Sequence, residues 1–218
     1  MQRMDSEHVR RLLKLYFIMG SANCLKTPLE TLVEAMDGGI TLFQYREKGS
    51  TAFTGQAYVE LAQLLQQKCR ERKIPFIVND DIDLAVALDA DGVHVGQKDA
   101  PARSIRERLG AHKIIGVSAH NLKEAQQAIA DGADYLGVGP VYPTSSKDDA
   151  EAVQGTGVIE ELRRSGLTIP LVGIGGITAA NARPVIQAGA DGISVISAIA
   201  GAADIRGAAR NFLRVIQQ

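Results

Sequence analysis

The chain has 218 residues, of which 45% are apolar, and its 24 Lys and Arg against 25 Asp and Glu give a net charge of −1. A chain of this length can form one domain with a sizeable core, and nucleic-acid-binding and membrane-surface proteins usually carry a basic excess that is missing here. No apolar run reaches the roughly 18 residues that a membrane-spanning helix needs. At the amino terminus, the acidic Asp5 and Glu7 favour a helix followed by a strand over a signal peptide, so we expect a cytoplasmic protein.

Short apolar runs alternate with longer amphipathic segments along the chain. Strand candidates cover residues 15–19, 40–46, 75–80, 92–97, 113–119, 135–143, 170–176 and 192–198. Helical patterns cover residues 28–39, 52–72, 81–90, 101–110, 121–132 and 178–189. Another helix begins by residue 158, and a final one ends at residue 216. Thr27 and Asn121 are placed to cap two of these helices, and Leu61, Leu64 and Leu65 are predicted to form the inward stripe of the longest.

This alternation gives eight strand–helix units, and buried strands separated by helices pair in parallel. A weak repeat supports the count, because MDGGITL, DADGVHV, DGADYLG and AGADGISV each place a turn rich in Gly and Asp before a strand. An open doubly wound sheet is the alternative, but no G-x-G-x-x-G follows the first strand. We therefore predict one α/β domain over residues 1–218, a single-domain (β/α)8 TIM barrel with a short amino-terminal helical extension.

The segment ITLFQYREK, residues 40–48, leads an apolar strand directly into polar side chains. Because side chains alternate along a strand, Gln44, Arg46 and Lys48 share one face, which suits a ligand with several anionic oxygens. From this segment alone, a strand end whose charges simply meet water is an equally good interpretation. Polar residues also follow the other strands, where a barrel has its active site: Asn79, Asp80, Gln97, Asp99, Ser118, Thr144, Ser145, Ser146, Lys147 and Ser197.

Asp80 and Asp99 leave neighbouring strands, so their carboxylates are predicted to meet. Oxygen ligands without a His or Cys companion favour Mg²⁺ completed by water and phosphate oxygens. Taken alone, a role in capping the following helices is an equal alternative for both residues. The cations Arg46, Lys48 and Lys147 on the same rim favour a magnesium pyrophosphate over the capping role.

A second anion site is predicted at the GIGG turn after the seventh strand and at Ile196 and Ser197 on the eighth. Loops at these positions of a barrel commonly bind phosphate through backbone N–H groups. Among the histidines, a core or rim role is favoured for His94, while His120 keeps a functional role open. The acidic residues Asp148, Asp149 and Glu151 are expected in a solvated, mobile loop that could act as a lid.

Taken together and in this order, QYREK, VNDD, GQKDA, GVSAH, YPTSSK and GIGGI resemble the thiamine-phosphate synthase family over nearly the whole chain. The resemblance implies a Mg²⁺-dependent (β/α)8 barrel that joins hydroxymethylpyrimidine pyrophosphate to a thiazole phosphate or its carboxylated precursor. The products would be thiamine phosphate and pyrophosphate. The family is thought to work dissociatively, with pyrophosphate leaving before the thiazole nitrogen adds to a pyrimidine cation, so that charge stabilisation matters more than a strong base.

The resemblance also assigns expected roles to residues. Ser118, Lys147 and Arg46 look catalytic, and Asp80 and Asp99 look like the Mg²⁺ ligands. The pyrimidine-pyrophosphate site would contain Gln44, Tyr45, Arg46, Glu47, Lys48, Asn79, Ser118 and Lys147. The thiazole-phosphate site would contain Thr144, Ser145, Ser146, Gly176, Ile196 and Ser197. In the family's PTxTK loop, Ser146 replaces the second Thr but keeps a hydroxyl, so little functional loss is expected.

Two other functions compete with this one. A thiazole tautomerase on the same barrel would keep the phosphate site but would have little use for Asp80, Asp99 and Lys147. A non-catalytic barrel that binds a phosphorylated ligand would not need every charged position to be occupied. The expected partners are therefore small-molecule substrates, with no nucleic acid and no membrane, and association into a homo-oligomer stays open.

Overall fold

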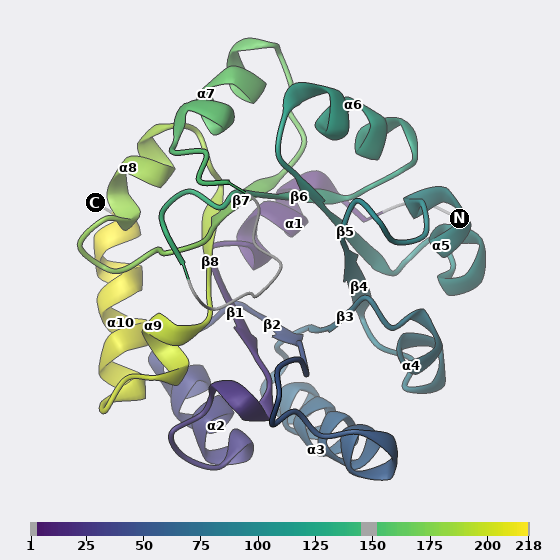
Figure 1. Ribbon diagram of the computed structural model, residues 1–218, viewed down its shortest axis with the longest axis vertical. Coiled ribbons are helices and arrows are strands. Elements are labelled where there is room, and N and C mark those ends of the chain that lie inside the picture. The colour runs from purple at the N-terminus through teal and green to yellow at the C-terminus, as the bar shows by residue number, and fades with distance from the viewer. Residues whose placement is uncertain (1–3, 145–151, 218) are drawn as a thin grey trace.

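The computed structural model describes residues 4–144 and 152–217. Eight parallel strands close into a barrel in the order β1 to β8, with β1 pairing with β8 (Figure 1). The strands are β1 Leu15–Met19, β2 Leu42–Tyr45, β3 Phe76–Asn79, β4 Gly92–Val95, β5 Ile114–Ala119, β6 Tyr135–Val138, β7 Leu171–Ile174 and β8 Gly192–Val195. The prediction of a TIM barrel is confirmed, and the closed strand order excludes the open doubly wound sheet.

Helices surround the strands (Figure 1). They are α1 Ser6–Leu12, α2 Pro28–Gly38, α3 Gly55–Arg72, α4 Ile82–Ala87, α5 Ala102–Leu109, α6 Leu122–Ala130, α7 Gly157–Arg164, α8 Ala182–Gln187, α9 Ser197–Ala200 and α10 Ile205–Ile216, with a 3-10 turn at Ser21–Asn23. No helix in the described part of the chain is long and apolar enough to cross a membrane. The predicted caps are confirmed: the Thr27 hydroxyl accepts from the N–H of Glu30, and the Asn121 side chain accepts from the N–H of Glu124.

The predicted inward stripe of α3 is wrong in one position. Leu61 and Leu65 are buried, but Leu64 is 44% exposed. The buried face runs through Leu61, Ala62, Leu65 and Cys69. At about 100° per residue this arc leaves Leu64 on the solvent side, so three leucines close in sequence do not share one face.

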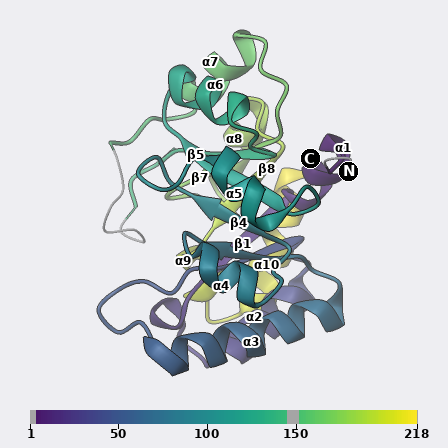
Figure 2. The ribbon, with the colours of Figure 1, turned by 90° about the vertical axis from the view of Figure 1, so that its right-hand side faces the viewer.

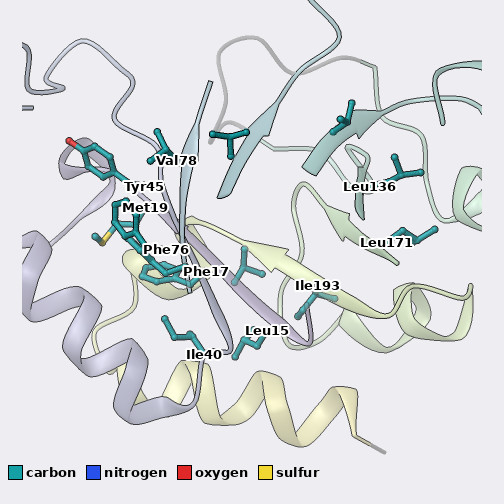
Figure 3. Packing of buried hydrophobic residues seen from close by; sticks show 14 of the residues in the cluster. Leu15, Phe17, Met19, Ile40, Tyr45, Phe76, Val78, Leu136, Leu171 and Ile193 are labelled. Carbon is teal, nitrogen blue, oxygen red and sulfur yellow. The ribbon is translucent and has the colours of Figure 1, made fainter. Parts of the chain in front are cut away.

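The core has two layers, one on each side of the strands. Outward side chains pack against the helices, and Figure 3 shows Phe17, Tyr45 and Phe76 side by side in this layer, where the rings of Tyr45 and Phe76 stack with centroids 6.2 Å apart. The inner layer fills the barrel with a separate cluster that includes Val9 and Leu13. The amino-terminal extension therefore closes one end of the barrel, and the loop from β2 to α3 lies at the other end (Figure 2).

The repeat seen in the sequence has a structural cause at the start of every second strand. Asp91, Asp134 and Asp191 directly precede β4, β6 and β8, and each carboxylate accepts a 2.8 Å hydrogen bond from a backbone N–H of the strand before it. Thr41 does the same ahead of β2, since its hydroxyl accepts from the N–H of Leu15 at 2.9 Å. These side chains satisfy N–H groups at the barrel's amino-terminal end.

Candidate active site

A cavity of about 550 Å³ opens at the carboxyl-terminal ends of the strands. Among the residues predicted for the site, those that line it are Arg46, Lys48, Asn79, Asp80, Asp99, Ser118, Thr144, Gly176, Ile196 and Ser197. A cavity of this size suits a small molecule. Ser145, Ser146, Lys147, Asp148, Asp149 and Glu151 lie outside the described residues.

Three residues from the QYREK segment do not line this cavity. Gln44 is buried inside the barrel, where its amide nitrogen donates to the Tyr16 hydroxyl at 2.6 Å. Tyr45 points outward and donates its hydroxyl to the carbonyl of Tyr58 at 2.9 Å. The Glu47 carboxylate accepts from the backbone N–H groups of Ser21 and Phe53, both at 2.8 Å, and so ties together the loops that follow β1 and β2. The structure therefore brings Arg46 and Lys48 to the cavity but not the side chains of Gln44, Tyr45 and Glu47.

One side of the cavity combines acidic and basic groups. Lys48 forms an ion pair with Asp80, and Asp99 lies next to Asp80. Burial raises the pKa of the Asp99 carboxyl, and the negative charge of Asp80 raises it further, against the opposing effects of the Gly96 N–H and the Lys48 ammonium. Two carboxylates held this close repel each other unless a cation lies between them.

Neither carboxylate acts as the cap of the next helix. Asp81 takes that role for α4, since its carboxylate accepts from the N–H of Leu84 at 2.8 Å. Asp99 accepts from the N–H of Gly96 at 2.7 Å within its own loop, and α5 begins after Pro101. The backbone of Asp80 has a φ of 60°, a left-handed conformation that is uncommon for a residue with a side chain. The helix-cap interpretation is therefore contradicted for both residues.

These two carboxylates fit the donor set of a hard divalent cation. Among the described residues, no group of three or more His, Cys, Asp or Glu is arranged to hold a metal, so the protein would supply few ligands. Mg²⁺ is commonly bound by one or two carboxylates, with water and substrate phosphates completing its coordination. The chemistry of the pair therefore suits a cation that arrives with a phosphorylated substrate.

The opposite side of the cavity is built from the ends of β7 and β8. Gly175 and Gly176 have φ angles of 99° and 62°. A Cβ at Gly176 would come within 2.4 Å of the carbonyl oxygen of Pro143, so this turn packs directly on the chain that follows β6. Asn181 supports the turn from outside, since its amide nitrogen donates to the carbonyl of Gly176 at 3.0 Å. Such a closely packed glycine turn suits the recognition of an anion by backbone groups.

A chain of buried polar groups runs beneath the cavity and ends at Ser118. It passes from Gln44 to Tyr16, from Tyr16 to Tyr135 at 2.8 Å, from Tyr135 to Nδ1 of His94 at 2.9 Å, and from Nε2 of His94 to the Ser118 hydroxyl at 3.0 Å. The ring of Tyr135 fits only because residue 116 is glycine, where a Cβ would lie 2.1 Å from the ring. Tyr16 and Tyr135 are not among the residues predicted for the site, although a tyrosine within an otherwise apolar strand is a sequence signal for a buried polar contact.

His120, for which the sequence allows a functional role, also lines the cavity. Its Nδ1 atom and its backbone N–H both contact the Glu124 carboxylate at 2.8 Å. Burial alone would raise the pKa of Glu124, but hydrogen bonds from His120 and Asn121 bring it below its usual value. The imidazole is thus held in one orientation at the rim.

A (β/α)8 barrel with paired carboxylates, cations and a glycine turn around a cavity at its strand ends is typical of enzymes that act on small molecules. The family model described as thiamine monophosphate synthase matches residues 15–199. This chain therefore belongs to the thiamine-phosphate synthase family, transferases of class EC 2.5.1.3.

Individual relatives agree with this assignment. The chain is 56% identical over 218 residues to the thiamine-phosphate synthase of Geobacillus thermodenitrificans, covering all of this chain and 98% of that protein. It is 58% identical over 209 residues to that of Geobacillus kaustophilus, covering 96% and 94% of the two chains. Among solved structures, a thiamine phosphate pyrophosphorylase from Pyrococcus furiosus superimposes with a TM-score of 0.84 at 39% identity, covering 96% of this chain and 98% of that one.

Proposed function

We propose that the enzyme condenses 4-amino-2-methyl-5-hydroxymethylpyrimidine pyrophosphate with 4-methyl-5-(2-hydroxyethyl)thiazole phosphate, or with its carboxylated precursor, and releases pyrophosphate. The observation that carries this proposal is the division of one cavity into two halves. Lys48, Asp80 and Asp99 lie on one half, Gly176 and Ser197 on the other. Such a cavity can bind two phosphorylated substrates with their reacting ends between the halves.

The half formed by the ends of β2, β3 and β4 would bind the pyrophosphate. Arg46 is only 7% exposed but still lines the cavity, so its guanidinium can meet a ligand away from bulk water, where an ionic hydrogen bond is stronger. Lys48 is more exposed and is bonded to Asp80. In the proposed complex, Arg46, Lys48 and Asn79 contact the pyrophosphate, and Lys147, which lies outside the described residues, joins them.

Asp80 and Asp99 would hold the proposed magnesium ion. When bound, Mg²⁺ would supply positive charge that stabilises the departing pyrophosphate. In a dissociative reaction, Arg46 and Lys48 would stabilise the negative charge on the leaving group. The cavity walls would keep the two reacting rings aligned. No residue needs to act as a strong base in this route.

Ser118 would contact the reacting pyrimidine. It lies one residue before the end of β5, lines the cavity, and its hydroxyl is hydrogen-bonded to His94. The thiazole phosphate would bind the other half through Thr144, Gly176, Ile196 and Ser197, with Ser145 and Ser146 completing the site. The nitrogen of the thiazole would then face the carbon from which pyrophosphate departs.

The paired carboxylates favour this reaction over isomerisation by a thiazole tautomerase. A tautomerase needs the phosphate-binding half, but Asp80 and Asp99 have no purpose in it, and neither caps a helix. A non-catalytic phosphate-binding barrel would not need them either. The half of the cavity that holds both carboxylates beside Arg46 and Lys48 therefore supports a pyrophosphate substrate.

The decisive experiment mixes the protein with Mg²⁺ and both substrates and follows thiamine phosphate by mass spectrometry. The synthase reaction should give equal amounts of thiamine phosphate and pyrophosphate, and EDTA should abolish turnover until Mg²⁺ is restored. Rearrangement of the carboxylated thiazole phosphate alone, unaffected by EDTA, would instead identify a tautomerase. Binding of both compounds without any product would identify a non-catalytic barrel.

A further inference from the structure

The hydrogen bonds of the polar chain beneath the cavity all run in one direction, from Gln44 to Ser118. This direction is set by the amide nitrogen of Gln44, which can only donate. The Gln44 amide nitrogen donates to the Tyr16 hydroxyl at 2.6 Å. Either hydroxyl of the Tyr16–Tyr135 contact, 2.8 Å long, could be the donor. Among the described residues the Tyr16 hydroxyl contacts only Gln44, which donates to it, and Tyr135, so the Tyr16 proton has an acceptor only if Tyr16 donates to Tyr135.

The same reasoning applies to the contacts of His94 with Tyr135 and with Ser118. Tyr135 accepts from Tyr16, so its own proton goes to Nδ1 of His94 at 2.9 Å. A neutral imidazole that accepts at Nδ1 carries its proton at Nε2. Nε2 of His94 lies 3.0 Å from the Ser118 oxygen, so His94 donates to Ser118.

This order of donors and acceptors determines what the Ser118 hydroxyl can do with its own proton. A serine oxygen that accepts from His94 keeps its own O–H for another partner, and Ser118 lines the cavity. We propose that Tyr16, Tyr135 and His94 are positioning residues that hold the Ser118 hydroxyl as a hydrogen-bond donor toward the reacting pyrimidine. This inference rests on the proposed function, because it needs the pyrimidine at Ser118.

Burial keeps the chain in this state. Tyr16 and Tyr135 are 1% and 0% exposed, and burial raises the pKa of both phenols, so both keep their protons over the neutral range. The rings of His94 and Tyr135 lie with centroids 5.4 Å apart, and a Cβ at Gly137 would approach the His94 ring at 3.0 Å. The imidazole therefore has little room to turn over, which preserves the order of donors and acceptors.

The first test uses the unmodified protein without ligand and reads the tautomer of His94 by ¹⁵N NMR. The expected result is a proton on Nε2 and none on Nδ1. A proton on Nδ1 would mean that the chain runs the other way and that Ser118 donates to His94, which overturns the proposal. This measurement does not depend on the proposed function, because no substrate is present.

The second test measures single-turnover rates with both substrates saturating. Tyr135→Phe removes the donor to Nδ1, so the rate should fall about tenfold, as expected for one lost hydrogen bond of about 1.4 kcal/mol. Tyr16→Phe should have a smaller effect, because Tyr135 can still donate to His94. Tyr58→Phe is the control: its hydroxyl bonds to Asp81 outside the barrel, and its loss should leave the rate unchanged.

A double-mutant cycle separates positioning from a structural role. If Tyr135 acts through Ser118, then Tyr135→Phe should slow the reaction about tenfold in the native background but hardly at all in a Ser118→Ala background. An equal slowing in both backgrounds would overturn the proposal. If Tyr135→Phe fails to fold, Tyr16→Phe replaces it in the cycle, with non-additivity of the same sign but smaller size expected. Absence of product from the unmodified protein would instead count against the proposed function.

Discussion

Lys48 and Asp80 form an ion pair across the ends of β2 and β3, and Asp99 from the loop after β4 lies beside the Asp80 carboxylate. One ammonium thus faces two carboxylates at this point of the cavity. A divalent cation bound between the carboxylates would reduce their mutual repulsion and free Lys48 for the substrate. Neutralising either carboxylate by substitution should therefore weaken the binding of Mg²⁺.

Asp80→Asn and Asp99→Asn should each raise the Mg²⁺ concentration needed for half-maximal activity by at least about tenfold, because each removes an anionic ligand. The measurement is a Mg²⁺ titration of turnover, together with Mn²⁺ binding followed by electron paramagnetic resonance. Asp83→Asn is the control, since Asp83 is exposed and pairs with Arg108 on the surface. Unaltered Mg²⁺ and Mn²⁺ titrations in both variants would remove Asp80 and Asp99 from the metal site.

Ser118→Ala should leave the fold intact and slow the chemical step by about one to three orders of magnitude, because one polar contact to the reacting ring is lost. Single-turnover kinetics with saturating substrates measures this step. Ser104→Ala is the matched control, since the Ser104 hydroxyl donates to a backbone carbonyl on the exposed side of α5. A native rate in the Ser118 variant would show that the hydroxyl is not part of the mechanism.

Much of the fold could be predicted because its signals are local. The Asp before β4, β6 and β8 repeats in the sequence because each carboxylate makes the same bond to the strand before it. The helix caps Thr27 and Asn121 were found for the same reason, since a cap bonds within three residues. Leu64 could not be placed by the same means, because its exposure depends on how α3 is rotated against the barrel.

The candidate site also contains residues that a local pattern predicts and residues whose position depends on distant contacts. Alternation along β2 correctly separates Arg46 and Lys48 from Tyr45, but it does not say how deep in the barrel each residue lies. Gln44 lies inside the barrel, below the cavity, because it is still within β2, which ends at Tyr45. There its amide contacts the hydroxyl of Tyr16, whose ring fills the barrel interior. Depth follows from the stagger of the strands, which is set by contacts between residues far apart in the chain. The sequence marks Tyr16 and Tyr135 as polar groups in apolar strands, but the connection from Gln44 to Ser118 follows only from the three-dimensional structure.

Gly176→Ala should raise the KM for the thiazole phosphate by about tenfold or more, because its φ of 62° disfavours a side chain and its Cβ would lie 2.4 Å from the Pro143 carbonyl oxygen. Gly132→Ala tests the backbone conformation alone: Gly132 has a φ of 94°, and its Cβ would meet nothing within 4 Å. Both variants should lose stability, but only the first should lose affinity for the thiazole phosphate. Similar KM values in the two would argue against a phosphate site at this turn.

Glu124→Gln should lower the free energy of unfolding at neutral pH and have little effect in acid. Because hydrogen bonds from His120 and Asn121 hold the pKa of Glu124 below its usual value, the carboxylate contributes stability above the pKa of the unfolded chain, and this contribution is lost as the pH falls through the folded pKa. Urea unfolding of both proteins from pH 7 down to about pH 3 measures the difference. A difference that stays constant over this range would contradict the assignment.

Ser194→Ala should stabilise the free protein, in contrast to most substitutions in a barrel interior. Ser194 is 2% exposed, and its hydroxyl has no hydrogen-bond partner among the described residues. A buried hydroxyl without a partner costs about 1–3 kcal/mol, so its removal should raise the free energy of unfolding by about 1 kcal/mol after a small loss of packing. Thr41→Val should act in the opposite direction, because the Thr41 hydroxyl accepts from Leu15 and donates to the carbonyl of Leu12 at 2.7 Å. Urea unfolding at neutral pH measures both variants. If Ser194→Ala instead destabilises the protein as Thr41→Val does, the Ser194 hydroxyl has a hydrogen-bond partner in solution.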